Sequence, residues 1–256
     1  MARSPSSLLV RRSLLPLLIA VLGWGLFTFV RSRVLLRNAA IIKAQSVRFS
    51  RDYFVGDPRK PTFNYFVLGD STAAGWGAAT LQGTYSYRVS QAVAARGYRV
   101  HVRNIAVGGA KIWDVCRDQL PTLSNAYPDL ITLTVGANDA THGTVDGDCI
   151  RGLRKLFTAF HASGARTILV ANVPDMVQAP ALPFPASAIV GKRAARINVA
   201  LYSEADLSKT RVVDIYAKGK LIYQKHPDQY AADLFHPSAK GYAVWAKLFI
   251  ESLPEL

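Results

Sequence analysis

Five short apolar runs alternate with longer helical patterns between residue 62 and the C-terminus. The runs are Phe63–Leu68, Tyr98–Ile105, Leu130–Val135, Thr167–Val173 and Arg211–Ile215, and the helical stretches are 84–96, 111–120, 149–163, 187–208 and 238–252. Strands that alternate with helices predict a parallel sheet with helices on both faces. The runs are continuously apolar, which is typical of strands buried on both sides. We therefore expect one three-layer α/β/α domain over residues 62–256.

An uncharged stretch of 18 residues, 13–30, precedes this domain. As a helix it would span about 27 Å, close to the roughly 30 Å of a bilayer's hydrocarbon core. A cleaved signal peptide is the alternative, but no A-x-A-like site follows the stretch, and Arg31 comes directly after it. We expect a basic tail over residues 1–12 and a transmembrane anchor over residues 13–30.

Residues 31–61 separate the expected anchor from the domain. Residues 31–51 indicate a basic juxtamembrane helix, and the prolines in 56–61 indicate a linker. We interpret the helix as a solvated stalk, with contact to lipid headgroups as the alternative.

The charge of the chain is concentrated at its N-terminus. The net charge is +14, and residues 1–60 hold 11 Lys/Arg against two acidic residues, which gives +9. This distribution favours an anionic membrane surface over nucleic acid as the partner. The main body has no zinc finger, aromatic RNA platform or basic recognition helix, so we expect no nucleic-acid binding. With only two cysteines, a disulfide-built mini-protein and a Cys-rich zinc module are excluded.

Small or polar residues follow three of the predicted strands at their carboxyl ends, where the active sites of such sheets lie. Ser71 follows the first strand, Gly109 the second and Asn138 the third. A serine can act as a nucleophile, and a glycine N–H or an asparagine amide can stabilise an oxyanion. Each residue also has an ordinary structural explanation, namely a helix N-cap, a tight turn and an Asx turn.

A fourth motif, Asp233-Leu-Phe-His236-Pro, precedes the last predicted helix. An aspartate three residues before a histidine in a loop can place its carboxylate on the imidazole Nδ1 and fix the tautomer. A capping aspartate beside a surface histidine is the plain alternative. Together with the strand-end residues, the motif supplies a nucleophile, a base, its orienting carboxylate and oxyanion donors. This set is what acyl transfer needs.

These motifs resemble those of the SGNH hydrolases, also called the GDSL esterase/lipase family. The matching segments are GDST, NIAVGGA, GAND and DLFHP, in family order over about residues 62–252. The resemblance implies a flavodoxin-like fold with the parallel strands in the order 2-1-3-4-5. It also implies that no cofactor or metal is needed.

The resemblance implies a role for each candidate site residue. Ser71 would be the nucleophile, His236 the base and Asp233 its orienting carboxylate. The oxyanion donors would be the N–H groups of Ser71 and Gly109 and the amide of Asn138. Gly109 is preferred to its neighbour because the family's donor is the second residue of a small-Gly pair.

We therefore expect a membrane-anchored serine hydrolase of carboxylic esters. A lipid or lysophospholipid ester suits the anchor, and an O-acetyl ester of a cell-envelope glycan is the alternative substrate. A non-catalytic SGNH-fold binding domain is a further alternative, which the complete set of site residues disfavours. Expected partners are a small-molecule ester and membrane lipid. The Pro-rich segment 174–185 is either a rigid connector or one wall of an acyl pocket.

Cys116 and Cys149 fall in the helices after the second and third predicted strands. In the implied strand order, right-handed crossovers put these helices on one face of the sheet, within reach of a disulfide. Two unpaired thiols are the alternative. Flanking positive charge does not decide orientation, whereas a disulfide would indicate an extracytoplasmic domain. We expect a single-pass protein with its catalytic domain on the extracytoplasmic side.

Overall fold

The computed structural model describes residues 6–255, so the first five residues of the expected basic tail lie outside it. The domain is built around a six-stranded sheet with the order β1-β3-β2-β4-β5-β6. Its strands are β1 (Asp52–Val55), β2 (Thr62–Gly69), β3 (Arg99–Asn104), β4 (Leu130–Thr134), β5 (Thr167–Ala171) and β6 (Thr210–Val213). Strands β2 to β6 pair in parallel and match the five predicted runs.

The sixth strand was not predicted, and it lies directly before the expected linker 56–61, which is a turn in the structure. Residues 31–61 were predicted to contain only a helix and a connection, but β1 pairs antiparallel with β3, with Tyr53 opposite Val102. Residues in β1 are alternately exposed and half-buried, because one face of this edge strand meets solvent. β3 likewise alternates between half-buried and buried residues, so it is not the continuously buried strand that its composition suggested.

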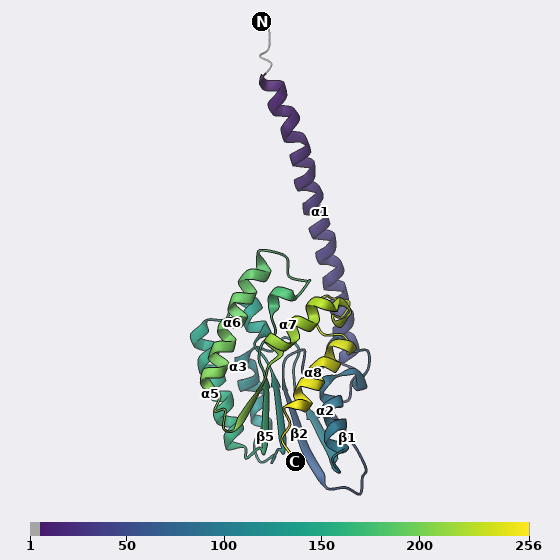
Figure 1. Ribbon diagram of the computed structural model, residues 1–256, viewed down its shortest axis with the longest axis vertical. Coiled ribbons are helices and arrows are strands. Elements are labelled where there is room, and N and C mark those ends of the chain that lie inside the picture. The colour runs from purple at the N-terminus through teal and green to yellow at the C-terminus, as the bar shows by residue number, and fades with distance from the viewer. Residues whose placement is uncertain (1–5, 256) are drawn as a thin grey trace.

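Helices cover both faces of the sheet and enclose two hydrophobic cores (Figure 1). One core lies under α5 (Asp146–Ala162), α6 (Ala186–Glu204) and the turns that follow α3 (Ile112–Asp114). The other lies under α2 (Tyr85–Ala94) and α8 (Ala239–Glu251). The three-layer prediction is therefore confirmed. Two helices were not predicted, α4 (Ala137–His142) and α7 (Ile215–Lys225), and both begin just after strands at the carboxyl edge.

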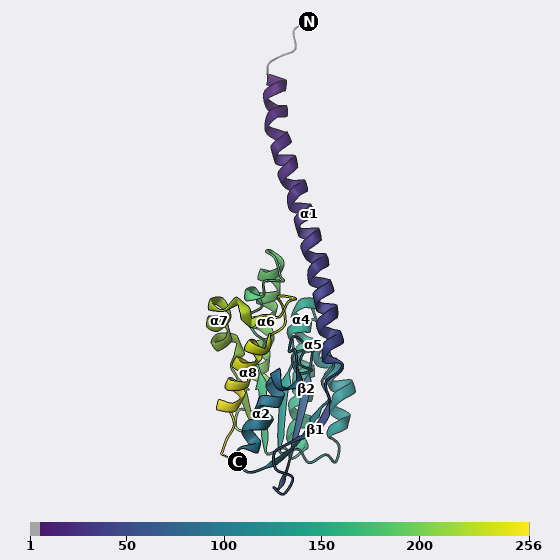
Figure 2. The same cartoon turned by 90° about the vertical axis from the view of Figure 1, so that its right-hand side faces the viewer.

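Helix α1 (Ser6–Ser46) is continuous from the apolar stretch into the basic segment. Its part from Pro16 onward is long and apolar enough to cross a membrane, although a signal sequence near an N-terminus has the same character. α1 extends well beyond the domain at one end of the sheet, and the C-terminus lies at the opposite end (Figures 1 and 2).

The last part of α1 is packed on the domain, so the prediction of a solvated stalk is wrong. Ile42 and Ser46 are 5% and 1% exposed. Arg31 and Asn38 donate hydrogen bonds to the carbonyl oxygens of residues 149 and 194 positions away along the chain. Contacts at such separations leave no periodic signal in the sequence.

The two cysteines are buried free thiols, so the disulfide alternative is wrong. Both lie in the same core, as the placement of their helices on one face implied. The Cys116 thiol instead donates to the carbonyl oxygen of Gly152 at 3.4 Å. Because the two thiols are free, the argument from a disulfide for an extracytoplasmic domain no longer applies.

Candidate active site

Ser71 follows a fixed end of the central strand β2. Gly69 has φ +132°, and a Cβ there would lie 1.9 Å from the carbonyl oxygen of Thr134 on β4. The buried side chain of Gln119 also holds Gly69, through two hydrogen bonds. Its Oε1 accepts from the Gly69 N–H, and its Nε2 donates to the Gly69 carbonyl oxygen, both at 2.8 Å. The direction in which the chain leaves β2 toward Ser71 is thus set by glycine and by one amide side chain.

The loop that carries Ser71 is tied to its neighbours by two further buried side chains. The Asn104 amide donates to the carbonyl oxygen of Ala73 at 2.8 Å and accepts from the N–H of Ala106 at 3.1 Å, which joins the turns after β2 and β3. The hydroxyl of Tyr242, on α8, donates a hydrogen bond to the carbonyl oxygen of Trp76 at 2.7 Å. These contacts fix the position of the buried Ser71, although the loop that carries it belongs to no long helix or strand.

Ser71, His236 and Asp233 form a chain of hydrogen bonds. The Nε2 of His236 lies 2.8 Å from the Ser71 Oγ, and its Nδ1 lies 2.5 Å from the Asp233 Oδ2. The other Asp233 oxygen accepts from the backbone N–H groups of Phe235 and His236, each at 3.0 Å. Leu234, at φ +57°, makes the tight turn that folds the histidine back over the aspartate. The predicted spacing of these two residues therefore has the expected geometry.

The carboxyl group of Asp233 is kept ionised by this environment. Burial opposes its charge, but the hydrogen bond from His236, the charge of that ring and the two backbone N–H groups hold the pKa below its usual value. An ionised carboxylate on Nδ1 keeps the proton on that nitrogen and leaves Nε2 free to accept the serine proton.

The two remaining predicted site residues are Gly109, on the loop after β3, and Asn138, in the first turn of α4 directly after β4. Gly109 is exposed, with φ +84° and open space where a Cβ would stand, whereas a Cβ on Gly108 would meet the Trp76 ring. The Asn138 amide nitrogen donates to the carbonyl oxygen of Ala110 at 3.1 Å, which joins the first turn of α4 to the glycine loop. That nitrogen carries two hydrogens, so one more remains for a ligand.

Two buried carboxyl groups support these loops. Asp139 accepts from the N–H of Ile112 at 3.0 Å and so braces the turn that carries Asn138; burial raises its pKa. Asp70 accepts from the N–H of Thr72 at 3.0 Å, and burial raises its pKa to about 6. Both carboxyl groups bond to the loop backbone, as expected for buttressing residues.

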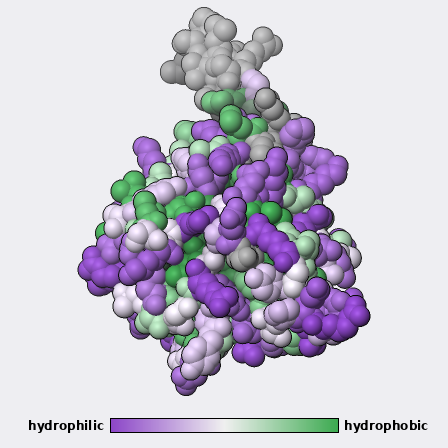
Figure 3. All heavy atoms as spheres, turned by 60° about the horizontal axis from the view of Figure 1, so that its bottom comes forward, coloured by the Kyte–Doolittle hydropathy of each residue, from purple (hydrophilic) through white to green (hydrophobic). Residues whose placement is uncertain are grey.

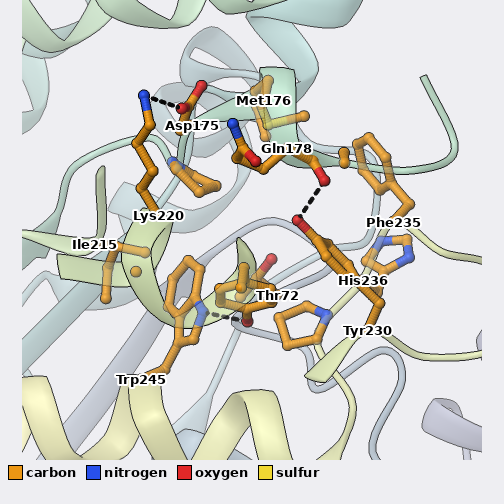
Figure 4. Close-up of a pocket in the computed structure, with 16 residues that line it drawn as sticks. Thr72, Asp175, Met176, Gln178, Ile215, Lys220, Tyr230, Phe235, His236 and Trp245 are labelled. Atoms are coloured by element: carbon orange, nitrogen blue, oxygen red, sulfur yellow. Dashed lines mark hydrogen bonds and ion pairs between the residues drawn. The ribbon is translucent and has the colours of Figure 1, made fainter. Parts of the chain in front are cut away.

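A cavity of about 50 Å³ adjoins His236 (Figure 4). Ile215 and Trp245 lie across it from Phe235 and His236, and its rim carries an ion pair of 3.1 Å between Lys220 and the buried Asp175. Five residues of the segment 174–185 line it: Pro174, Asp175, Met176, Gln178 and Ala179. This segment therefore forms one wall of a mostly apolar cavity beside the imidazole.

Three groups of residues around the site escaped the sequence analysis. The side chains of Gln119 and Asn104 form hydrogen bonds to the backbone of the loops. The ring of Trp76 packs on that of His236, with the ring centroids 5.4 Å apart. Helix α1 binds the loop before Asp233 through Asn38. For Gln119 a weak signal existed, because this polar residue falls at the helical spacing of the apolar residues Ile112, Val115 and Cys116.

The family of the chain can be stated from a comparison with known proteins. A model of the GDSL-like Lipase/Acylhydrolase family matches residues 67–244, more than half of the chain. The chain belongs to this family. The resemblance that the four motifs carry is thereby confirmed, and the matched region contains all of the candidate site residues.

The individual proteins that resemble the chain share low sequence identity with it. A GDSL-like esterase of Mycobacterium tuberculosis is 28% identical over 200 residues, which cover 73% of this chain and 60% of that protein. The chain thus spans about three fifths of the length of that relative. A lipase from a goat rumen metagenome has 17% identity and a TM-score of 0.61, with 73% of this chain and 95% of that one covered.

A second solved structure is a catalytic mutant of an acetylxylan esterase from Geobacillus stearothermophilus. It has 18% identity and a TM-score of 0.59, with 79% of this chain and 97% of that one covered. At such identities these two solved structures show a shared fold.

Proposed function

We propose that this GDSL-family protein is a membrane-anchored serine hydrolase of carboxylic esters. The observation that carries the proposal is the hydrogen-bonded chain from Ser71 through His236 to Asp233, with distances of 2.8 and 2.5 Å. Nucleophile, base and orienting group within hydrogen-bond reach are the signature of covalent acyl transfer.

In the acylation step the Ser71 oxygen attacks the ester carbonyl carbon while the His236 Nε2 takes the serine proton. The carbonyl π electrons move onto the oxygen and form a tetrahedral oxyanion. When that intermediate collapses, the bond to the alcohol oxygen breaks, and the imidazolium gives its proton to the leaving alcohol. Asp233 stabilises the imidazolium without taking its proton. The product of this step is an acyl ester of Ser71.

Deacylation uses the same groups with water as the nucleophile. His236 takes a proton from water, the hydroxyl oxygen attacks the acyl carbon, and the proton returns to the Ser71 oxygen as it leaves. The carboxylic acid is released and the enzyme is restored. In both steps the N–H groups of Ser71 and Gly109 and the Asn138 amide stabilise the oxyanion. Donors placed in advance act where charge develops.

The membrane part of the proposal rests on α1. Its apolar stretch is long enough to span a bilayer, and basic residues flank it on both sides. An anchored esterase suits a lipid or lysophospholipid-type ester, because such substrates reside in the same bilayer. The apolar lining of the cavity beside His236 is compatible with an acyl group.

A second substrate class is favoured by the size of that cavity. A cavity of about 50 Å³ holds only a few waters. A volume of this size suits an acetyl group better than a long chain that must be enclosed. An O-acetyl ester on a cell-envelope glycan is therefore the alternative substrate, and a long acyl chain would have to leave the cavity along the surface.

The proposal is tested on the full-length protein with a fluorophosphonate probe and a panel of esters. The wild type should be labelled, and Ser71→Ala should lose both the label and hydrolysis. Ser208→Ala, in an exposed turn away from the site, is the matched control and should retain both. The panel contains short and long acyl esters and acetylated sugars, so that the preferred member separates the two substrate classes. Labelling that persists in Ser71→Ala would refute the mechanism, and a fully inert wild type would support the non-catalytic binding domain.

A further inference from the structure

The second half of α1 crosses the edge of the sheet where the candidate active site lies. The Arg31 guanidinium donates to the carbonyl oxygen of Pro180, in the loop after β5, at 2.6 Å. About two helical turns further on, the Asn38 amide donates to the carbonyl oxygen of Ala232 at 2.7 Å. Ala232 is the residue directly before Asp233. α1 is therefore fixed to the loop that carries two of the three candidate catalytic residues.

The same helix and the turn after it reach the other loops of this edge. The Lys43 ammonium lies 6.0 Å from the centre of the Trp76 ring, in the loop that follows Ser71. Arg51 donates to the carbonyl oxygen of Ala106, in the glycine loop. With Ile42 and Ser46 buried between these contacts, the domain cannot swing freely on α1. The orientation of α1 therefore sets the orientation of the active site.

Helix geometry gives the height of the site above the bilayer. Arg31 directly follows the apolar stretch 13–30, so the loop at Pro180 lies within one arginine side chain of the end of that stretch. Asn38 lies eight residues after Val30, which is about 12 Å along the axis. A headgroup layer is about 5–8 Å thick on each side. The loop with Asp233 and His236 thus lies just outside the headgroup layer. The carboxyl ends of the sheet strands face this layer (Figures 1 and 2).

Exposed apolar side chains surround the site on this edge. The segments that follow β3, β4, β5 and β6 each expose at least one of them, and we call this set the catalytic rim: Val107, Val145, Val177, Phe184 and Leu221. Phe184 is 84% exposed, an unusual state for a large aromatic ring in water. The opposite edge also exposes Tyr127 and Leu207, and the end of the domain turned away from the free end of α1 shows many hydrophilic side chains with apolar ones between them (Figure 3).

Positive charge accompanies the rim. Arg33 and Arg37 are exposed on the part of α1 between the two residues that bind the domain loops, Arg31 and Asn38. Residues 31–60, on the domain side of the apolar stretch, hold eight Lys/Arg against two acidic residues, which gives a net charge of +6. Apolar side chains together with exposed arginines at the level of the headgroups are complementary to an anionic leaflet.

We propose that the catalytic rim is a membrane-docking surface for the anionic phospholipid leaflet that α1 enters. The docked half of α1 turns the active site toward this leaflet, so that esters reach Ser71 from the bilayer and not from bulk water. The substrate class is then an ester of a membrane-resident molecule. This inference rests on the anchor of the proposed function.

A depth measurement tests the docking directly. Full-length protein is reconstituted in vesicles of phosphatidylcholine and phosphatidylglycerol, and an NBD dye is attached to Phe184→Cys or, as a control, Leu207→Cys. Leu207 is also exposed but precedes β6, at the opposite edge of the sheet, and the two native cysteines are buried. Doxyl-labelled lipids should quench the dye at 184 several-fold more than the dye at 207. Equal quenching would overturn the proposal.

An activity measurement tests its consequence. The double variant Phe184→Ser/Leu221→Ser should hydrolyse a long-chain fluorogenic ester embedded in the vesicles about tenfold more slowly than the wild type. Each rate is divided by the rate of the same protein on a soluble acetate ester. Leu207→Ser should leave this ratio unchanged, and an unchanged ratio in the double variant would overturn the proposal.

Two controls separate this inference from the proposed function. If neither ester is hydrolysed by the wild type, the esterase proposal fails, while the dye measurement still decides the docking. If the protein does not float with vesicles after an alkaline wash, the anchor fails and the docking fails with it.

Discussion

Replacing Asp70 with asparagine is expected to change how the stability of the protein depends on pH. Asp70 directly precedes Ser71 and is 3% exposed. Burial raises its pKa from 3.8 to about 6, and the hydrogen bond from the Thr72 N–H offsets this only in part. A carboxyl group with such a shift binds its proton more tightly in the folded state than in the unfolded state.

The sign and size of the effect follow from linkage. Since the folded-state pKa is raised, the contribution of Asp70 to stability is fully present below pH 3.8 and is lost as the pH rises through about 6. A difference of about two pH units corresponds to about 3 kcal/mol in total. Between about pH 4.5 and about pH 7, roughly 2 kcal/mol of this is lost. An asparagine does not titrate, so the Asp70→Asn variant loses no stability from this position over the same pH range.

The assay is denaturant unfolding of the full-length protein in detergent, followed by tryptophan fluorescence at several pH values. The free energy of unfolding of Asp70→Asn minus that of the wild type should rise by about 2 kcal/mol from about pH 4.5 to about pH 7. Asp206→Asn is a control that should stay nearly flat over this range, because hydrogen bonds from Ser208 lower the pKa of that exposed carboxylate below 3.8 and it is ionised throughout the range. A difference for Asp70→Asn that stays flat over this range would refute the reasoning.

Three further predictions concern the oxyanion site, the docked helix and the cysteines. Asn138→Ala should lower kcat by about 10²–10³ with little change in KM; an effect on KM alone would make Asn138 a ground-state binding residue. Ile42→Ser should speed tryptic cleavage at the end of α1 about tenfold, because it removes a buried contact. The exposed neighbour Ile41 is the control, and equal effects of Ile41→Ser would show that the helix is not docked. Cys116 and Cys149 should be alkylated without reductant after unfolding, as read by peptide mass mapping, and a protected pair would contradict the free thiols.

The strands of the sheet could be predicted because their signal is local. β4 and β5 are buried at every position and show as continuous apolar runs. β1 has only four residues, none of them buried, and it becomes a strand because β3 offers an unpaired edge. α7 contains Gly219 and closely spaced lysines, so it resembles a loop until it packs beside α8.

The candidate site also has residues that a local sequence signal reveals and residues that it does not. Asp233 and His236 were predictable because a three-residue spacing in one loop brings them together. Ser71 was predictable from its place after a strand. In contrast, Gln119 acts on a glycine 50 residues away, and Asn38 acts on a carbonyl oxygen 194 residues away. Such partners are set by the tertiary fold and have no motif of their own.

The antiparallel strand β1 has a practical consequence for making a soluble fragment of the protein. Strand β1 covers the outer edge of β3, and a fragment cut at the proline-containing connection after β1 would expose the backbone N–H and C=O groups of β3. Exposed strand edges pair with other molecules and lead to aggregation. A fragment that starts near residue 47 would keep β1 and the bond from Arg51 to Ala106. We expect the longer fragment to be monodisperse and the shorter one to form aggregates through β3.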